Sequence, residues 1–210
     1  MSDRIIFVRH GQTADNVQNR LSAAFPGAEL SITGIDQARA LTELLSKREI
    51  AAIYTSPLRR AEQTAAIIAR GRRLPIIIDY RLREMSCGGY EGRNDPEVYQ
   101  HLDSVWRSWT EASDLAVKAG PGGESAWQIL ERSTSALTRI RHDYPTGTVL
   151  VVTHSGVISL LVPRISINLD PGFGYAEWVG NCELIEIESF HDDYKCVSWG
   201  SRIVPDASAQ

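Results

Sequence analysis

The chain has 210 residues, of which 43% are hydrophobic and 23% are charged, as is ordinary for a globular domain. Its formal net charge of −4 argues against nucleic acid or an anionic membrane surface as partner, because both require clustered positive charge. No apolar stretch approaches the length of a transmembrane helix, and the N-terminus lacks the apolar core of a signal peptide. The three cysteines show no CxxC spacing, so we expect a reduced, cytoplasmic setting without a disulfide framework.

The first predicted elements are a strand and a helix joined by a long loop. Residues 5–9 form a continuous apolar run that ends in arginine, which is typical of a fully buried parallel strand. Residues 11–32 are rich in small and polar side chains and predict a loop. Thr33, with Asp36 three residues later, predicts the N-cap of a helix whose buried positions recur at helical spacing.

A second strand–helix pair and a third strand follow. Residues 51–55 predict the second strand. Ser56 and Pro57 then predict the N-cap and the first position of the next helix. Residues 76–78, three isoleucines, predict the third strand, and residues 80–93 predict a glycine-rich loop.

The second half of the chain continues the alternation of helix and strand. Residues 94–118 carry apolar side chains at helical spacing. Ser125 with Gln128 predicts a capping box at the start of a long helix. Residues 149–152 predict a fully buried strand, and a helix is expected from about residue 156.

The last predicted unit is an antiparallel hairpin made of residues 181–188 and 194–199. Because strand and helix patterns alternate before it, we expect an α/β protein: a three-layer α/β/α sandwich with a mostly parallel central sheet. The length predicts a single domain over residues 1–210, with residues 93–120 as a small helical, cap-like insertion.

Polar residues follow two of the predicted buried strands directly. Arg9 and His10 end the first strand, and His154 and Ser155 come after residues 149–152. In open α/β sheets, ligands bind beyond the carboxyl ends of the strands. The sequence therefore predicts a site for an anion that also contains a nucleophile.

Two further side chains complete the chemistry that phosphoryl transfer requires. Arginine forks match phosphate oxygens, so Arg9 and an arginine of the Arg59–Arg60 pair suit charge neutralisation. Nearby cations favour a neutral histidine, which leaves a lone pair on the attacking nitrogen of His10. Glu84, in the glycine-rich loop, is the candidate proton donor.

These segments jointly resemble the histidine phosphatase superfamily, also called phosphoglycerate mutase-like proteins, nearly from end to end. The matching motifs are RHGQTADN, LSITGIDQA, TSPLRRAEQTA, LREMSCGGYEG, PGGES and VLVVTHSGVI. The resemblance implies the phosphoglycerate mutase-like fold.

The resemblance also implies roles for individual residues. His10 would become phosphorylated, and Glu84 would act as general acid and then as the base that activates water. The phosphoryl group would be bound by Arg9, Asn16, Arg60 and His154. Arg60 is the matching arginine, whereas Arg59 is expected to face solvent. For Asn16 a turn cap is an alternative role. Ser155 would either offer its backbone N–H to the phosphate or serve only as a helix N-cap.

We expect a metal-independent phosphatase that hydrolyses a small phosphorylated metabolite without a cofactor, as a monomer or homodimer. Alternatives are a phosphoglycerate mutase-type phosphoryl transfer and a catalytically silent phosphate-binding module. The mutase is disfavoured because the stretch between Gly92 and Pro121 is short, and a metal site because no Asp/His cluster has ligand spacing. Trp106, Arg107 and Trp109 are candidates for the pocket mouth, with the core as the alternative for both tryptophans.

Overall fold

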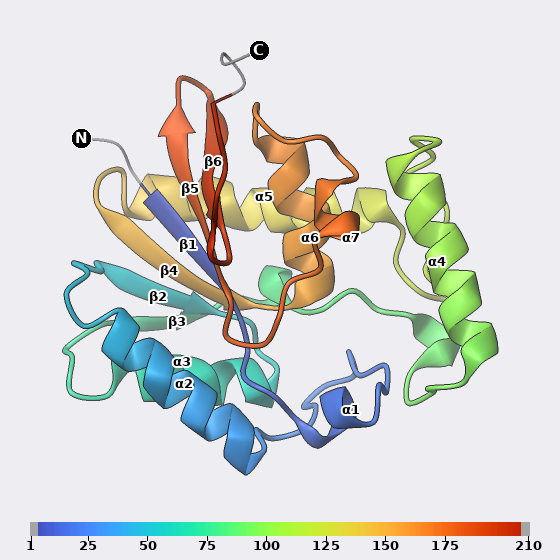
Figure 1. Cartoon of the computed structure of the whole chain (residues 1–210), viewed down its shortest axis with the longest axis horizontal. Helices are drawn as coiled ribbons and strands as arrows, with labels where there is room; N and C mark the ends of the chain where they lie inside the picture. The colour runs from blue at the N-terminus through green and yellow to red at the C-terminus, as the bar shows by residue number, and fades with distance from the viewer. Residues whose placement is uncertain (1–3, 207–210) are drawn as a thin grey trace.

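A seven-stranded sheet with the order β3-β2-β4-β1-β5-β6-β7 forms the centre of the computed structural model, which describes residues 4–206 (Figure 1). The strands are β1 (Arg4–Arg9), β2 (Ala52–Thr55), β3 (Ile76–Ile78), β4 (Thr148–Thr153), β5 (Leu184–Phe190), β6 (Asp193–Trp199) and β7 (Arg202–Ile203). β1 to β4 pair in parallel, whereas β5 runs antiparallel to β1 and forms the closing hairpin with β6. The predicted mixed sheet is confirmed.

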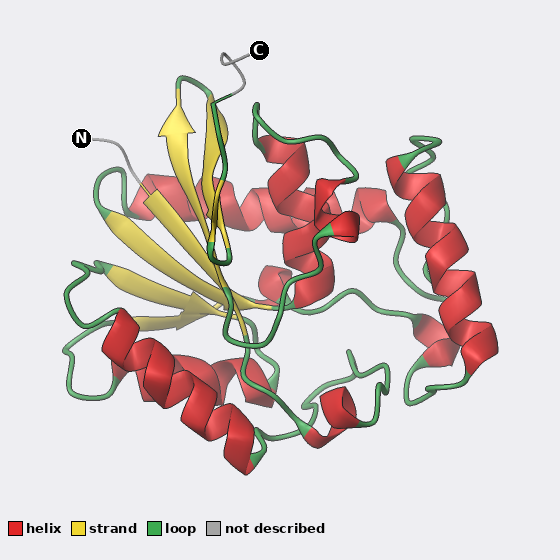
Figure 2. Cartoon of the chain, viewed as in Figure 1, coloured by secondary structure: helices red, strands yellow, loops and turns green. Residues whose placement is uncertain are grey.

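Helices cover both faces of this sheet, so the three layers expected from the sequence are present (Figure 2). The helices are α1 (Ala14–Val17), α2 (Ile32–Leu44), α3 (Arg59–Ala69), α4 (Pro96–Thr110), α5 (Ala126–Asp143), α6 (Ser155–Ile165) and α7 (Phe173–Ala176). Two 3₁₀ turns, η1 (Tyr80–Leu82) and η2 (Gly88–Tyr90), interrupt the predicted glycine-rich loop. None of the helices in residues 4–206 is both long and apolar enough to cross a bilayer.

Alternation along β1 divides the core between the two helical layers. Ile6 and Val8 belong to the apolar cluster under α2 and α3, whereas Ile5 and Phe7 belong to the cluster under α5 and α6. This is the period of two that a strand buried on both faces requires.

α4 packs outside these layers and has an apolar cluster of its own. Val98, Leu102 and Trp109 on α4 share this cluster with Ile129 of α5 and Val157 of α6. Figure 1 shows α4 standing at the far side of α6 from the sheet. The apolar spacing within residues 94–118 therefore marked a helix correctly.

The start of α2 differs from the prediction. Its N-cap is Ser31, whose Oγ accepts a hydrogen bond from the Gly34 amide at 3.0 Å, so Thr33 lies inside the helix. The earlier start brings Gly34 against the loop after β1. There, a Cβ on Gly34 would lie 2.1 Å from the Gln12 carbonyl oxygen. Ser31 and Thr33 are both suited to capping, and the long-range backbone contact of Gly34 decides between them.

The loop that was predicted over residues 11–32 contains the short helix α1, which was not predicted. The start of α3 also differs from the prediction. The N-cap of α3 is Leu58, not Ser56. The Ser56 Oγ instead accepts from the Leu58 amide at 3.2 Å, a local turn that competes with the helix. The same hydroxyl lies 2.7 Å from Nε2 of His154, which ties this turn to the candidate site.

Candidate active site

A pocket of about 570 Å³ opens beyond the carboxyl ends of β1 and β4, where the sequence predicted the ligand. Its lining includes Arg9, His10, Asn16, Arg60, Glu84 and Ser155. The remaining predicted residue, His154, is fully buried beside His10, with 5.0 Å between the ring centroids. The structure therefore brings all the predicted site residues together, although His154 does not line the pocket.

His10 is held as a neutral imidazole with its lone pair on one defined nitrogen. Nδ1 lies 2.8 Å from the Gly11 carbonyl oxygen and therefore carries the proton. Nε2 accepts a hydrogen bond of 2.9 Å from Nε of Arg60. Burial, reinforced by the charges of Arg60 and Arg9, holds the pKa of His10 well below its usual 6.5. Nε2 is thus an unprotonated nitrogen at the pocket.

His154 has the opposite tautomer. Arg60 donates from Nη2 to Nδ1 of His154 at 3.2 Å, and Nε2–H of His154 donates to the Ser56 Oγ at 2.7 Å. Burial is the main cause that holds the pKa of His154 well below 6.5, with Arg60 adding to it. Arg60 therefore contacts both imidazoles with one guanidinium.

Two arginines, the buried Arg60 and the half-buried Arg9, line the pocket, and each has a buried donor atom without a partner in residues 4–206. Arg60, at the start of α3, leaves Nη1 without an acceptor, and Arg9, at the end of β1, leaves Nε without one. Burial lowers the pKa of both guanidiniums. Because an unsatisfied buried donor is costly, this pair indicates a site for an acceptor-rich anion. Arg59, in contrast, is exposed as expected and pairs with Glu29.

Glu84 presents its carboxyl group to the same pocket from the loop after η1. Its oxygens accept from the Met85 amide at 2.8 Å and from the Gly156 amide, in the first turn of α6, at 3.3 Å. Burial raises the pKa of Glu84, although the two amides and the nearby arginines oppose the shift. The protonated form is therefore favoured beyond the usual range of a carboxyl group.

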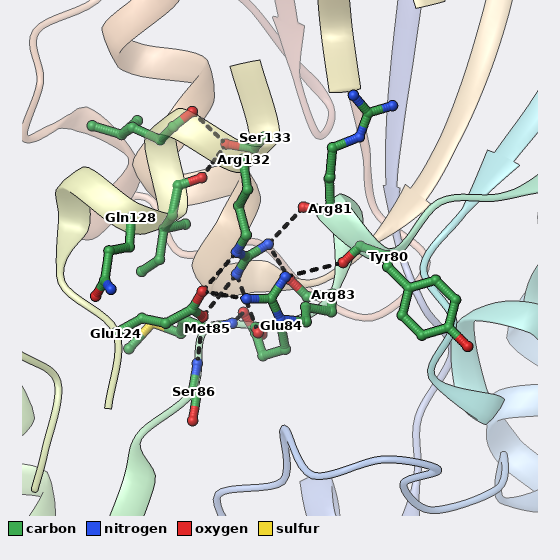
Figure 3. A network of polar contacts seen from close by, with 12 residues as sticks. Tyr80, Arg81, Arg83, Glu84, Met85, Ser86, Glu124, Gln128, Arg132 and Ser133 are labelled. Atoms are coloured by element: carbon green, nitrogen blue, oxygen red, sulfur yellow. Dashed lines mark hydrogen bonds and ion pairs between the residues drawn. The ribbon is translucent and has the colours of Figure 1, made fainter. Parts of the chain in front are cut away.

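The Glu84 loop is fixed by Arg132, a buried residue of α5 that the sequence analysis missed (Figure 3). Its guanidinium donates to three carbonyl oxygens of the loop, those of Arg81, Arg83 and Glu84. It also forms a two-pronged ion pair with Glu124, at 2.9 and 3.0 Å. Glu124 in turn accepts from the Ser86 amide at 3.0 Å, so both partners hold the backbone around Glu84. Glu124 lies in the PGGES motif, which the resemblance includes without giving Glu124 a role.

Asn16 makes the capping contact that the sequence left as its alternative role, and it also lies at the pocket. Its Oδ1 accepts from the Thr13 amide at 3.0 Å and so caps α1, while the residue also lines the pocket. Asn181, which the sequence analysis did not single out, donates from Nδ2 to this oxygen at 3.2 Å and to the His10 carbonyl oxygen at 2.9 Å. A lone asparagine before a hairpin gives no sequence signal for such a contact.

Ser155 is not the helix N-cap. α6 begins at Ser155, and its N-cap is His154, which has an extended backbone and makes no side-chain capping bond. Ser155 and Gly156 at this helix start both line the pocket, and the Gly156 amide donates to the Glu84 carboxyl group.

The three α4 residues predicted at the pocket mouth lie in different surroundings. Trp106 lines the pocket, whereas Trp109 is 1% exposed and donates from its indole N–H to the Val117 carbonyl oxygen in the core. Arg107 is exposed and pairs with Asp103 at 2.9 Å.

In the part of the chain that the structure describes, no group of three His, Cys, Asp or Glu side chains is placed to hold a metal ion.

The fold and the pocket define an α/β protein whose site combines two neutral histidines, two arginines with unpartnered donors and one carboxyl group. The family model of the histidine phosphatase superfamily, branch 1, matches residues 5–202. The chain belongs to this superfamily.

Named relatives include several phosphatases. An Escherichia coli adenosylcobalamin/alpha-ribazole phosphatase is 32% identical, over 77% of this chain and 78% of its own length. A glucosyl-3-phosphoglycerate phosphatase of Mycobacterium tuberculosis is 31% identical over 83% of both chains. A solved mycobacterial glucosyl-3-phosphoglycerate phosphatase in complex with VO3 superimposes with a TM-score of 0.81 at 28% identity, over 95% of this chain and 99% of that one. Several other mycobacterial relatives are longer, and the match covers 45% of their length.

Proposed function

We propose that this protein is a metal-independent phosphomonoesterase that hydrolyses a small phosphorylated metabolite through a phosphohistidine on His10. The observation that carries the proposal is the unprotonated Nε2 of His10, which accepts from Arg60 in a pocket where Arg60 and Arg9 each have a buried donor without a partner in residues 4–206. A nucleophile and the charge neutralisation for a phosphoryl group are thus combined at one point.

In the first half of the reaction, Nε2 of His10 attacks phosphorus. Arg60 transfers its Nε hydrogen bond from Nε2 to a phosphate oxygen, which frees the lone pair. Arg9, Arg60 and Asn16, with the Ser155 amide, bind the phosphoryl oxygens, and His154 supports them by accepting the Nη2 hydrogen bond of Arg60. The bond between phosphorus and the leaving oxygen breaks as the N–P bond forms, and Glu84 gives its proton to that oxygen.

In the second half, the Glu84 carboxylate takes a proton from a water molecule. The resulting hydroxide oxygen bonds to phosphorus, the N–P bond breaks, and its electron pair returns to Nε2 of His10. Inorganic phosphate leaves, and Glu84 is protonated again for the next cycle. The raised pKa of Glu84 suits both steps, because the group must exchange its proton near neutral pH.

The whole of residues 1–210 would act as one histidine phosphatase domain, with residues 93–120 as a small helical cap. The support is that α4 contributes Trp106 to the pocket while its other face packs on α5 and α6. A cap of this size leaves the phosphoenzyme open to water, which favours hydrolysis over transfer to a second hydroxyl.

Hydrolysis of p-nitrophenyl phosphate in excess EDTA tests the proposal. We expect full activity in EDTA, because arginines supply the charge neutralisation that a metal ion supplies elsewhere. Arg60→Ala should lower kcat/KM by about 10²- to 10³-fold, whereas Arg59→Ala, at the exposed neighbouring position, should leave it nearly unchanged.

Other outcomes would overturn the proposal. Loss of activity in EDTA with recovery on addition of a divalent ion would exclude metal independence. Binding of phosphate without turnover of any monoester would identify a silent module. Transfer of phosphate between hydroxyls that outpaces hydrolysis would identify a mutase.

A further inference from the structure

Three aromatic side chains form one wall of the pocket that holds His10. Trp106 of α4 stacks on Tyr175 of α7 with 5.7 Å between ring centroids and 9° between ring planes. Trp178, two residues beyond α7, meets Trp106 edge to face at 5.3 Å. All three line the pocket, and Trp178 remains 44% exposed. We call these residues the aromatic wall.

The aromatic wall is fixed before any substrate arrives. Trp106 is largely buried and packs edge to face on the core residue Trp109 at 5.3 Å. The Tyr175 hydroxyl donates to the Asp103 carboxylate, which also pairs with Arg107. Because Trp106 and Tyr175 are held in place in this way, these two side chains lose little entropy when a ligand packs on the wall.

The remaining charges of the pocket lining disfavour a second anion. Apart from the groups at the phosphoryl site, the lining contributes three carboxylates, Asp15, Glu91 and Asp103, and one guanidinium, Arg20. Glu91 is already bonded to two backbone amides, at 2.7 and 2.9 Å, and Asp103 is paired. A leaving group with a carboxylate of its own would therefore meet a net negative surface.

We infer that the preferred substrate is a phosphate monoester whose leaving group carries an aromatic or heteroaromatic ring and no anionic group. The ring packs on the aromatic wall while the phosphoryl group lies between Arg9 and Arg60. Stacking of a base on an aromatic side chain is favourable whatever the base, so the wall selects for a flat π-face. This inference rests on the proposed phosphatase function and names the substrate class for the same pocket.

Two matched pairs of substrates test the inference. Adenosine 5′-monophosphate and ribose 5-phosphate differ by the heteroaromatic base, and phosphoethanolamine and phosphoserine differ by one carboxylate. We expect kcat/KM to favour the first member of each pair by about tenfold or more. A ratio near one or below one in either pair would overturn the inference.

Variants connect these ratios to the residues concerned. Trp178→Ala should bring the ratio of adenosine 5′-monophosphate to ribose 5-phosphate close to one, mainly through slower turnover of the nucleotide, and Trp178→Phe should restore much of it. Asp15→Asn should raise kcat/KM for phosphoserine relative to phosphoethanolamine. Trp127→Ala, which removes an exposed tryptophan of α5 outside this pocket, is the matched control and should change neither ratio. An unchanged nucleotide ratio in Trp178→Ala would overturn the role of the aromatic wall.

One enzyme preparation distinguishes failure of the proposed phosphatase function from failure of the inferred substrate class. If p-nitrophenyl phosphate is not hydrolysed, the proposed phosphatase function fails. If it is hydrolysed while the matched pairs show no preference, the phosphatase function stands and only the substrate class is wrong.

Discussion

Burial pushes His10 and Glu84 toward their neutral forms, which are the forms that the proposed reaction requires. The pKa of His10 is lowered by burial and by Arg60 and Arg9, while burial raises the pKa of Glu84. A neutral imidazole can attack, and a protonated carboxyl group can give up a proton. One desolvated pocket therefore prepares a nucleophile and an acid at the same pH.

Glu84→Gln should separate substrates by their leaving groups. An alkyl oxygen must be protonated as it departs, so kcat/KM for alkyl phosphates should fall by about 10²- to 10⁴-fold. p-Nitrophenolate leaves without help, so phosphorylation of the enzyme by that ester should be much less affected. The measurement is kcat/KM for both substrate types.

The pH profile provides the control for this variant. In the wild type, kcat/KM for an alkyl phosphate should fall as the pH rises through the raised pKa of Glu84, and Glu84→Gln should lack this limb. Equal losses on both substrate types with an unchanged profile would indicate a structural role for Glu84.

At the scale of elements, α5 positions the Glu84 loop although it contributes no residue to the pocket lining. Arg132 reaches from the helix to the loop carbonyls, and Glu124, just before the helix, holds the Ser86 amide (Figure 3). The capping box of Ser125 and Gln128, confirmed as predicted, fixes the helix start next to Glu124. The carboxyl group of Glu84 is thus placed by the packing of α5 and by the hydrogen bonds that Arg132 and Glu124 make to the loop backbone.

Arg132→Met should destabilise the fold and also weaken proton donation. Removing one partner of a buried ion pair leaves the other uncompensated, which costs about 3–5 kcal/mol. In addition, kcat/KM should fall more for alkyl phosphates than for p-nitrophenyl phosphate, because Glu84 loses its placement. Urea unfolding and the two-substrate assay measure these effects, and Arg132→Lys should recover part of both.

The matched control is Arg139→Met on the same helix. Arg139 pairs with Asp143 on the surface, so its loss should change neither stability nor substrate ratio appreciably. If Arg132→Met lowered stability but affected both substrate types equally, Arg132 would have a structural role only.

Across the whole molecule, patterns within single segments predicted the layers of the fold and the position of the site. The features that these patterns missed involve contacts between segments far apart in the chain. The apolar runs of β1 and β4 and the spacing in α4 depend on periodicity within each segment, so they were predictable. The N-caps of α2 and α3 lie beside contacts that reach beyond each segment, because Gly34 approaches Gln12 and Ser56 bonds to His154 in addition to the local turn bond from the Leu58 amide. The contacts of Arg132 and Asn181 are of the same kind, because they join segments far apart in the chain.

The buried histidines should also make the stability of the whole fold depend on pH. The folded pKa of His10 lies below its unfolded value of 6.5. Its contribution to stability is therefore fully present above pH 6.5 and is lost as the pH falls toward the folded pKa. Below pH 6.5 this single histidine accounts for a decrease of up to about 1.4 kcal/mol per pH unit in the free energy of unfolding.

Denaturant unfolding between pH 7 and pH 5 measures this effect. His10→Gln should lose stability less steeply than the wild type as the pH falls, whereas His191→Gln, at an exposed turn, should follow the wild type. Identical pH dependence in His10→Gln and the wild type would show that His10 is not held neutral by the fold.

If His10 carries the phosphoryl group during turnover, the phosphoenzyme can be trapped. Glu84→Gln with p-nitrophenyl phosphate should accumulate the phosphoenzyme, because the leaving group needs no acid whereas the attacking water lacks its base. After rapid quenching, mass spectrometry should find acid-labile, base-stable phosphate on the peptide that contains His10. The same phosphate should be absent when His10→Ala is added. Phosphate on another residue, or turnover by His10→Ala at a rate close to that of the wild type, would show that His10 is not the residue that carries the phosphoryl group.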